Sequence, residues 1–414
     1  MADNKTAIEA QAWHTNKARP AIPRTIWVLG FVSLFMDLSS ELVHSLMPIF
    51  LVGTLGASVL TVGVIEGIAE ATALLVKVFS GAISDFVGRR KGLMLLGYGL
   101  AALTKPLFPL ATSVETVFVA RFLDRIGKGI RGAPRDALVA DVAPPAIRGA
   151  CFGLRQSMDT VGAFLGPALA IGLMIVFHGD ITSVLWVAVV PAIVCVALII
   201  FGIHEPAHDA SQHRFRTPIH LNVLRHFSSA YWGVVAIGAL FTLARFSEAF
   251  LILRAQQTGF SASWVPLVMV VMALFYMLSA YPVGKWSDRV SRRTLLGMGL
   301  VLLIVADLVL ACTDSVAMTL VGVALWGLHM GFSQGLLAAM VADTAPPQLK
   351  GSAFGVFNLV SGISMLVASV LAGSLWQVYS AAVTFYAGAA ISALALLLLL
   401  VRRGGQGKDF NRPS

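Results

Sequence analysis

The stretch of sequence that decides the fold is Ala140-Asp141-Val142-Ala143-Pro144-Pro145, because a close copy of it occurs later in the chain. It returns 202 residues further on as Ala342-Asp343-Thr344-Ala345-Pro346-Pro347. A second segment is repeated at an offset of 203 residues, since Gly81-x-x-Ser84-Asp85 returns as Gly284-x-x-Ser287-Asp288. Two separate segments repeated at nearly one offset indicate a chain built from two related halves.

The composition indicates that both halves lie in a membrane. Of the 414 residues, 57% are hydrophobic and only 12% are charged, whereas about a quarter of a soluble domain is charged. An apolar run of about 20 residues crosses a bilayer as a helix, and the runs here are continuous rather than alternating as in a membrane barrel. We predict an all-α membrane protein of about twelve transmembrane helices in two pseudo-symmetric six-helix bundles. The spans are expected near 25–52, 59–82, 91–110, 114–142, 147–177, 181–202, 229–256, 262–285, 294–312, 316–342, 350–376 and 379–402.

Basic residues gather in alternate connections between these spans, while the opposite connections, such as 53–58 and 258–263, contain no Lys or Arg. The positive-inside rule therefore predicts an inner (plasma) membrane protein with both chain ends in the cytoplasm. The net charge of +9 belongs to these loops and not to a nucleic-acid surface. We expect an N-terminal tail (1–24), a first bundle (25–202), a cytoplasmic linker (203–228), a second bundle (229–402) and a C-terminal tail (403–414).

The repeated segments are expected at tight cytoplasmic turns, where glycine permits close approach of the backbone. Their charged residues either latch neighbouring helices together in one conformation or anchor the topology, and the sequence leaves both interpretations open. The residues concerned are Gly81, Asp85, Gly88, Arg89, Arg90, Asp141 and Arg148 in the first half, and Asp288, Arg292, Asp343 and Lys350 in the second.

Three stretches of the sequence resemble motifs of the major facilitator superfamily. Gly81-Ala-Ile-Ser-Asp85-Phe-Val-Gly88-Arg89-Arg90-Lys91 resembles its signature loop. Arg121-Phe-Leu-Asp124-Arg125 is similar to its arginine motif, which implies that Arg121 helps proton coupling, although Gln is commoner at 124 and Gly is expected at 125. Gly153 with Gly162-x-x-x-Gly166-Pro167 resembles the motif of its antiporters, although Ala170-Ile171 replaces the usual Gly-Gly. The resemblance covers about residues 25–402 and favours efflux.

Four acidic residues lie inside the first two spans, and His44 shares a helical face with two of them. An ionised side chain facing lipid at mid-membrane costs about 2.5 to 3.5 kcal/mol on insertion scales, so these acids must face the bundle interior, a water-filled cavity or each other. Crowded carboxylates in a low dielectric hold protons more tightly, which predicts that at least one carries a proton. The candidates are Asp37, Glu41, Glu66 and Glu70, with Glu41 first. The alternative is that they only pair with Lys77, Lys105 or the cations of the fourth span.

A charged stripe follows in the fourth and fifth spans, formed by Asp124, Lys128, Arg131, Arg135, Arg155 and Asp159. The plain interpretation is a salt-bridge network that seals the cytoplasmic side. The alternative is that Arg131, Arg135 or Arg155 holds an anionic substrate. Gly129, Gly132 and Pro134 are expected to loosen the helix there. In the seventh span Arg245 can pair with Glu248 three residues on, and Arg254 either snorkels to the membrane interface or contacts a ligand.

These features predict a secondary transporter that works by alternating access and exchanges protons for an exported small molecule, either drug-like or an organic metabolite. The alternative is proton-coupled uptake of an organic anion or a metal chelate such as a siderophore. The sequence has no Gly-x-x-x-x-Gly-Lys-Ser/Thr loop for ATP. The spacing His-Glu-x-x-His occurs once, at His204–His208, but Pro206 interrupts the helix that such a metal site needs. The spacing Gly-x-Ser-x-Gly occurs once, at Gly331–Gly335, but inside an apolar span and not between a strand and a helix, so neither pattern indicates an enzyme. We expect a monomer in the lipid bilayer, with no cofactor, no resident metal ion and no nucleic-acid partner.

Overall fold

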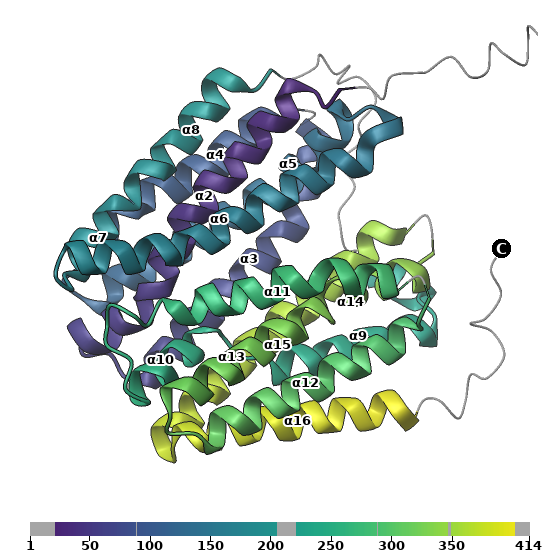
Figure 1. Cartoon of the computed structure of the whole chain (residues 1–414). Helices are drawn as coiled ribbons and strands as arrows, with labels where there is room; N and C mark the ends of the chain where they lie inside the picture. Colours follow the sequence, from purple (N-terminus) through teal and green to yellow (C-terminus); the bar gives the residue numbers. More distant parts are fainter. Residues whose placement is uncertain (1–20, 88, 205–220, 288, 347–348, 402–414) are drawn as a thin grey trace, which may run out of the picture.

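The computed structural model describes residues 21–87, 89–204, 221–287, 289–346 and 349–401. Throughout these residues the regular structure is helical, without strands, and Figure 1 shows two bundles side by side. The described residues leave out nearly all of both expected tails and most of the expected linker. They also leave out Gly88, Asp288 and the side chain of Asp85. The fold class predicted from the sequence, an all-α membrane protein of two related bundles, is confirmed.

The first bundle, purple to teal in Figure 1, contains the spans predicted between residues 25 and 202. Its first span ends in a π-helix, and short 3-10 turns follow α4 and precede α6. The elements are α2 (Arg24–Ile49), the π-helix Phe50–Thr54, α3 (Val59–Val87), α4 (Arg90–Thr104), Lys105–Leu107, α5 (Val114–Val142), Pro145–Ile147, α6 (Arg148–Val176), α7 (Ile181–Val187) and α8 (Val189–Gly202).

The second bundle, teal to yellow, begins with the 3-10 helix Leu221–His226. Its spans are α9 (Ser229–Ala244) with α10 (Ala249–Gln257), α11 (Leu267–Trp286), α12 (Arg292–Cys312), α13 (Val316–Gly331) with α14 (Gln334–Thr344), α15 (Lys350–Val378) and α16 (Ala381–Val401). Polar side chains begin several of the helices, as at Ser228, whose Oγ accepts a hydrogen bond from the N–H of Tyr231 at 3.2 Å.

Ten helices or joined helix pairs in the described residues are long and apolar enough to cross a membrane. The remaining two predicted spans are α4, which has 15 residues, and α5, which has 29 residues but carries the charged stripe. A span that turns its charges toward other helices needs no uniformly apolar surface, so these two complete the expected set of about twelve.

Two spans are broken where the sequence pattern predicted continuous helices. The seventh span is interrupted at 245–248, between α9 and α10, and the tenth at 332–333, between α13 and α14. By contrast, α5 runs without interruption through Pro134, so the expected loosening around Gly129, Gly132 and Pro134 was wrong. The glycines instead allow close packing, since a Cβ on Gly129 would lie 2.6 Å from Cβ of Val76 in α3.

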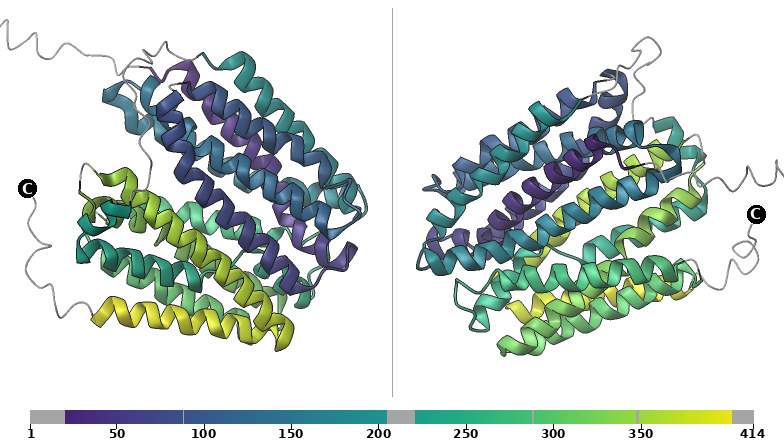
Figure 2. Two further views of the ribbon diagram at one scale, coloured as in Figure 1. Left: turned by 180° about the vertical axis from the view of Figure 1, so that it is seen from behind. Right: turned by 45° about the horizontal axis from the view of Figure 1, so that its top comes forward.

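The two bundles share an apolar core at one end only. We call the end at which α2 begins and α16 ends the terminal end, and the opposite end the far end. At the far end a single cluster joins both bundles, with Leu46 and Phe50 from the first packed together with Phe250, Met269 and Trp376 from the second. Toward the terminal end each bundle has clusters of its own. The bundles accordingly converge at the far end and diverge toward the terminal end (Figures 1 and 2).

Along the interface between the bundles, α3 packs against α15, and Figure 2 shows the two long helices side by side from behind. Glycines on both helices allow this approach. A Cβ on Gly67 would lie 3.2 Å from Cα of Leu366, and a Cβ on Gly373 would lie 2.9 Å from Cα of Leu60. Side chains at these positions would push the helices apart, so the small residues fix where the two bundles touch.

Candidate functional site

The most deeply buried acid of the first bundle is Glu66 of α3, whose side chain is 1% exposed. It accepts two hydrogen bonds from Arg121 of α5, from Nε to Oε1 at 3.0 Å and from Nη2 to Oε2 at 2.8 Å. Such a bidentate pair fixes both side chains and keeps both charges from lipid. Arg121, singled out by its motif, is therefore held between α3 and α5 rather than facing a cavity.

His44 of α2 lies between two carboxylates. Its Nδ1 is 3.4 Å from Oε2 of Glu41, one turn earlier on the same helix, and its Nε2 is 3.6 Å from Oε2 of Glu66. The Glu41 side chain is 21% exposed, in contrast to the buried Glu66. Arg121, Glu66, His44 and Glu41 thus form a continuous chain of ionisable groups from the interior of the bundle to a partly accessible carboxylate.

The two residues at which the arginine motif departs from its family pattern each have a partner. Asp124 accepts a hydrogen bond from Nζ of Lys105 at 2.9 Å, and the same Nζ donates to Oγ of Ser40 at 3.1 Å. Arg125 pairs with Glu70 at 3.2 Å. The unusual acid and the unusual base are thus compensated by charges on neighbouring elements. Glu66 and Glu70 therefore pair with cations of the fourth span, as the alternative interpretation of these acids predicted.

Asp37 differs from the other acids of this group. Among the residues that the structure describes it has no ion pair within 4.0 Å, although Arg131 and Lys128 act on it electrostatically, as do Glu41 and Asp159. Lys128 stands at the middle of α5, is exposed, and also acts on Glu41. Lys128 shares a helical face with the buried Asp124, one turn earlier, so its exposed side chain lies on the side of α5 that faces the interior of the bundle.

A second ionic cluster joins α5 and α6 nearer the terminal end. Arg135 lies 3.5 Å from Asp159 and 3.1 Å from Asp136, and Arg155 lies 3.5 Å from Asp159 and 3.8 Å from Asp136. The two arginines and two aspartates balance, so this geometry fits the network interpretation better than capture of an anion. Arg131 is not part of the cluster, because its guanidinium lies over the ring of Tyr98 with 4.6 Å from Cζ to the centroid.

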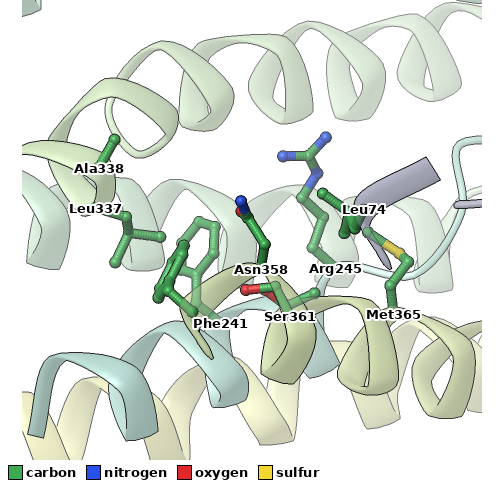
Figure 3. A pocket seen from close by; sticks show the side chains of 10 residues that line it. Leu74, Phe241, Arg245, Leu337, Ala338, Asn358, Ser361 and Met365 are labelled. Atoms are coloured by element: carbon green, nitrogen blue, oxygen red, sulfur yellow. The ribbon is translucent and has the colours of Figure 1, made fainter. Parts of the chain in front are cut away.

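In the second bundle the break in the seventh span presents charged groups to the interface. The expected pair forms, with Nη2 of Arg245 3.3 Å from Oε1 of Glu248. Beside it lies a cavity of about 250 Å³ whose walls come from α3, α9, α14 and α15 (Figure 3). Figure 3 shows the Arg245 guanidinium above apolar and polar side chains of both bundles. The lining residues are Leu74, Phe241, Thr242, Arg245, Leu337, Ala338, Phe357, Asn358, Ser361 and Met365.

Arg254 is buried at the far end, and its Nη2 lies 3.5 Å from Oδ1 of Asp314, whose side chain is 96% exposed. Its Nε donates to the carbonyl of Leu310 at 3.0 Å, and its Nη2 donates to the carbonyl of Thr313. These carbonyls belong to the end of α12, where helix carbonyls lack partners within the helix and the dipole favours a cation. Arg254 therefore clamps α10 to α12 rather than lining the cavity.

The repeated turns carry one equivalent ion pair in each half. Arg90 lies 3.5 Å from Asp141 in the first bundle, and Arg292 pairs with Asp343 in the second. Asp141 and Asp343 are 202 residues apart, which is the offset of their repeated segment, whereas Arg90 and Arg292 are also 202 apart although the segment before them repeats at 203. The pairs join α4 to α5 and α12 to α14. Arg89, Arg148 and Lys350 are exposed at helix starts, and Gly81 faces Ala133 of α5, 3.5 Å from an added Cβ.

The antiporter-like motif lies on the face of α6 that packs against α2. A Cβ on Gly166 would lie 2.8 Å from the carbonyl oxygen of Leu38 and 2.9 Å from the amide nitrogen of Leu42, and a Cβ on Gly162 would clash with the carbonyl of Leu34. Pro167 is buried within the continuous α6, whereas Gly153 has no neighbour within 4 Å of an added Cβ. Two motif glycines thus bring α6 close to the helix that carries Asp37, Glu41 and His44.

Two participants were missing from the sequence-derived site. Asp136 completes the cluster with Arg135 and Arg155, and Lys105 neutralises Asp124. Asp136 could have been found in the sequence, because it is an acid within an expected span and directly follows Arg135. Lys105 was expected only as a partner for the acids of the first two spans, because sequence spacing relates residues of one helix and not of two.

The sequence profile of the Major Facilitator Superfamily matches residues 29–255 and 235–413, and so covers nearly the whole chain. The chain belongs to the Major Facilitator Superfamily. An uncharacterized MFS-type transporter of Methanocaldococcus jannaschii is 29% identical over 385 residues, which cover 92% of this chain and 95% of that protein. A multidrug resistance protein, MdtH of Photorhabdus laumondii, is 27% identical over 350 residues, covering 80% and 82% of the two chains.

Solved superfamily structures share the fold at low sequence identity. A transporter of the POT family in complex with a thioalcohol-conjugated peptide has a TM-score of 0.78 at 14% identity and covers 92% of this chain and 96% of its own. The nucleoside transporter NupG has a TM-score of 0.74 at 12% identity, with 92% and 100% covered. This member of the superfamily is therefore a multi-pass membrane transporter and not an enzyme.

Proposed function

We propose that this transporter exports a small amphipathic molecule in exchange for protons. The observation that carries the proposal is His44, which lies within 3.6 Å of both Glu41 and Glu66. A histidine beside a carboxylate can exchange a proton with it, because an imidazole gains and loses protons near neutral pH. Glu41, the accessible carboxylate, exchanges protons with water, and Glu66, held by Arg121, fixes the position of His44.

Asp37 supports the same assignment. It lies one turn before Glu41 on α2 and has no ion pair among the described residues, so its charge is not already neutralised by a fixed partner. An acid of this kind gains or loses a proton more readily than one held in a bidentate pair. We assign proton coupling to Asp37, Glu41 and His44, with Arg121 and Glu66 as the group that positions His44.

The proposed substrate site is the cavity at the bundle interface. Its walls combine aromatic and aliphatic side chains with Asn358, Ser361 and Arg245, a mixture that suits an amphipathic molecule with a polar or anionic group. Export is favoured by the similarity to a multidrug resistance protein and by the antiporter-like glycines of α6. Coupling and binding would then occupy different bundles, Asp37 and Glu41 in the first and the cavity mainly in the second.

The orientation belongs to the proposal as well. If the basic loops face the cytoplasm, the terminal end is cytoplasmic, and the shared core at the far end closes the external side. The structure would then correspond to the inward-facing state of alternating access. Labelling of single cysteines introduced at Arg89 and Ser261, which are both exposed, with a membrane-impermeant maleimide tests this in a protein whose exposed Cys312 is replaced by serine. Only the cysteine at 261 is expected to react in intact cells.

Transport itself is tested in two steps. A thermal-shift screen of drugs, metabolites and metal chelates identifies compounds that bind the folded protein, since such ligands raise its melting temperature. A compound found in this way is then followed in proteoliposomes with an imposed pH gradient. We expect the gradient to drive accumulation of the compound in the wild type, opposite in direction to the proton flow, and to fail to drive it in Glu41→Gln and Asp37→Asn.

Glu115→Gln is the matched control, because it removes an exposed carboxylate in the first turn of α5 that forms no ion pair among the described residues. It must transport as the wild type does. Coupling that survives in both Glu41→Gln and Asp37→Asn removes the proton-site assignment. If the compound accumulates in the same direction as the proton flow, the proposed export is wrong and the alternative, uptake of an organic anion or chelate, takes its place.

A further inference from the structure

One buried acid of the second bundle has no part in the function proposed above. Asp307 of α12 is 0% exposed, and neither oxygen of its carboxyl group has a hydrogen-bond partner among the residues that the structure describes. It shares a helical face with Leu303 and Leu310, two residues of the apolar core that joins the bundles. In the sequence, Asp307 is recognisable as an acid inside the apolar run 294–312. The candidate residues that we named in the second half from the sequence do not include it.

The carboxyl group of Asp307 lies at the junction of several elements. A Cβ built on Gly388 of α16 would lie 2.7 Å from Oδ2 of Asp307 and 3.1 Å from Cε1 of Phe246. Only glycine at 388 leaves room for the carboxyl group beside α16. Asp307 and the ring of Phe246 therefore lie against the same point of that helix.

Phe246 connects Asp307 to the break in the seventh span. It belongs to residues 245–248, which separate α9 from α10. Its ring centroid is 5.4 Å from that of Trp326 in α13 and 5.4 Å from that of Phe385 in α16. The break is thus held by aromatic contacts, and the ring of Phe246 lies near the acid, so a rearrangement of the break would change what covers Asp307.

The elements that pack against α12 and the nearby break offer little compensation for a negative charge, because burial is the one influence on the Asp307 carboxyl group and no charged group among the described residues acts on it. From α13 comes His329, fully buried, with Nδ1 3.0 Å from the carbonyl oxygen of Trp326 and Nε2 without a partner in the described part of the chain. From the break come Arg245 and Glu248, which pair with each other. Between Ala381 and Val401, α16 has no Asp, Glu, Lys, Arg or His, and its Tyr386 is exposed. Asp343 of α14 is paired with Arg292.

An ionised carboxylate buried without a partner costs several kcal/mol, far more than the neutral acid. We propose that Asp307 is a second proton-binding site of this transporter, protonated in the conformation described here and deprotonated when the break at 245–248 rearranges. On release, the carboxylic acid becomes a carboxylate and the proton passes to water. Arg245, next to Phe246 in the chain, is the cation that a rearranged break would bring toward the new charge.

The experiment is infrared difference spectroscopy of the full-length protein in lipid bilayers as the pH is changed, with protons as the only probe. The wild type is expected to show a carbonyl-stretching band of a buried protonated carboxyl group that loses intensity as the pH rises. Asp307→Asn must remove this band, and Asp307→Glu must shift its frequency. Glu115→Gln, which removes an exposed carboxylate of the first bundle, must leave the band unchanged.

A band that persists in Asp307→Asn overturns the proposal, as does the lack of any such band in the wild type. A band that belongs to Asp307 but does not respond to pH also overturns it, because the acid would then be a permanently neutral packing group. If Asp307→Asn does not fold, as judged by gel filtration, the wild type and Asp307→Glu still decide the outcome. Glu41→Gln must keep the Asp307 band, so failure of the first proton site remains distinguishable from failure of the second.

Discussion

At the scale of single residues, the first bundle places charges inside a membrane by giving nearly every one a partner on another helix. Glu66 meets Arg121, Glu70 meets Arg125 and Asp124 meets Lys105. Each pair joins two elements, so the pairs also fix how the helices are rotated about their axes. The exceptions, Asp37 and the partly exposed Glu41, are the residues to which we assign proton exchange.

Removing one member of the most buried pair tests this division between fixed and exchanging charges. Glu66→Gln leaves the Arg121 guanidinium buried opposite a neutral amide, and breaking such a pair costs about 3 to 5 kcal/mol. We expect a clear fall in melting temperature for Glu66→Gln in detergent or lipid nanodiscs. Glu115→Gln, at the surface, should melt with the wild type. Equal melting temperatures for all three proteins would contradict a structural role for the Glu66 pair.

At the scale of elements, close approach between helices depends on glycine at a few positions. The contact of α6 with α2 is the clearest, because an added Cβ at Gly166 would lie 2.8 Å from the carbonyl oxygen of Leu38. In a membrane, where lipid is as apolar as the helices, such small-residue contacts supply much of the packing between helices. They also hold α2, with its acids, against the helix that carries Arg155 and Asp159.

Two glycines of α6, Gly166 and Gly172, test whether the close contact of α6 with α2 depends on glycine. Gly166→Ala is expected to lower the melting temperature, because overpacking costs about 1 to 3 kcal/mol. Gly172→Ala places its methyl group where no atom lies within 4 Å, and alanine is the better helix former by about 0.5 to 1 kcal/mol. Its melting temperature should therefore equal or exceed that of the wild type. A Gly166→Ala protein as stable as Gly172→Ala would show that the α2–α6 contact yields easily.

At the scale of the whole molecule, the two bundles are joined by one apolar core at the far end and have separate cores toward the terminal end. Alternating access requires the joined end to separate and the other end to close. The cost of exposing this core is balanced by burying surface at the terminal end, where the repeated pairs Arg90–Asp141 and Arg292–Asp343 lie. The two halves of the repeat therefore contribute equivalent contacts to that end.

A cross-link at the far end should stop this exchange without destroying the binding site. Cysteines introduced at Leu60 and Gly373 lie next to each other across α3 and α15, although a side chain at 373 must displace α3, since its Cβ would lie 2.9 Å from Cα of Leu60. The untreated double variant is therefore the first control, and it must transport the compound. After treatment with a short bis-maleimide, the double variant is expected to lose proteoliposome transport of the compound found by thermal shift and to keep the thermal shift itself. Leu60→Cys alone, treated identically, should transport. Full transport by the cross-linked protein would show that the far end does not open.

Most of the architecture follows from the sequence by itself. In lipid every backbone group must be bonded within its own span, so an apolar run of sufficient length becomes a helix whatever surrounds it. That local rule gave the positions of the spans, and the repeat at 202 residues gave two related bundles. The residues that carry charge into the membrane, among them Asp37, Glu66 and Arg121, were also visible in the sequence.

The partners of those charges were decided only by the tertiary structure. Which acid meets which base depends on how each helix is rotated and how closely two helices approach, and both are set by contacts between residues far apart in the chain. For this reason the pair of Lys105 with Asp124 and the bonds of Arg254 to the end of α12 were not foreseen, and neither were the breaks at 245–248 and 332–333. The isolation of Asp307 is of the same kind, because the spacing of residues along one helix says nothing of the carbonyls, rings and glycines that face it from others.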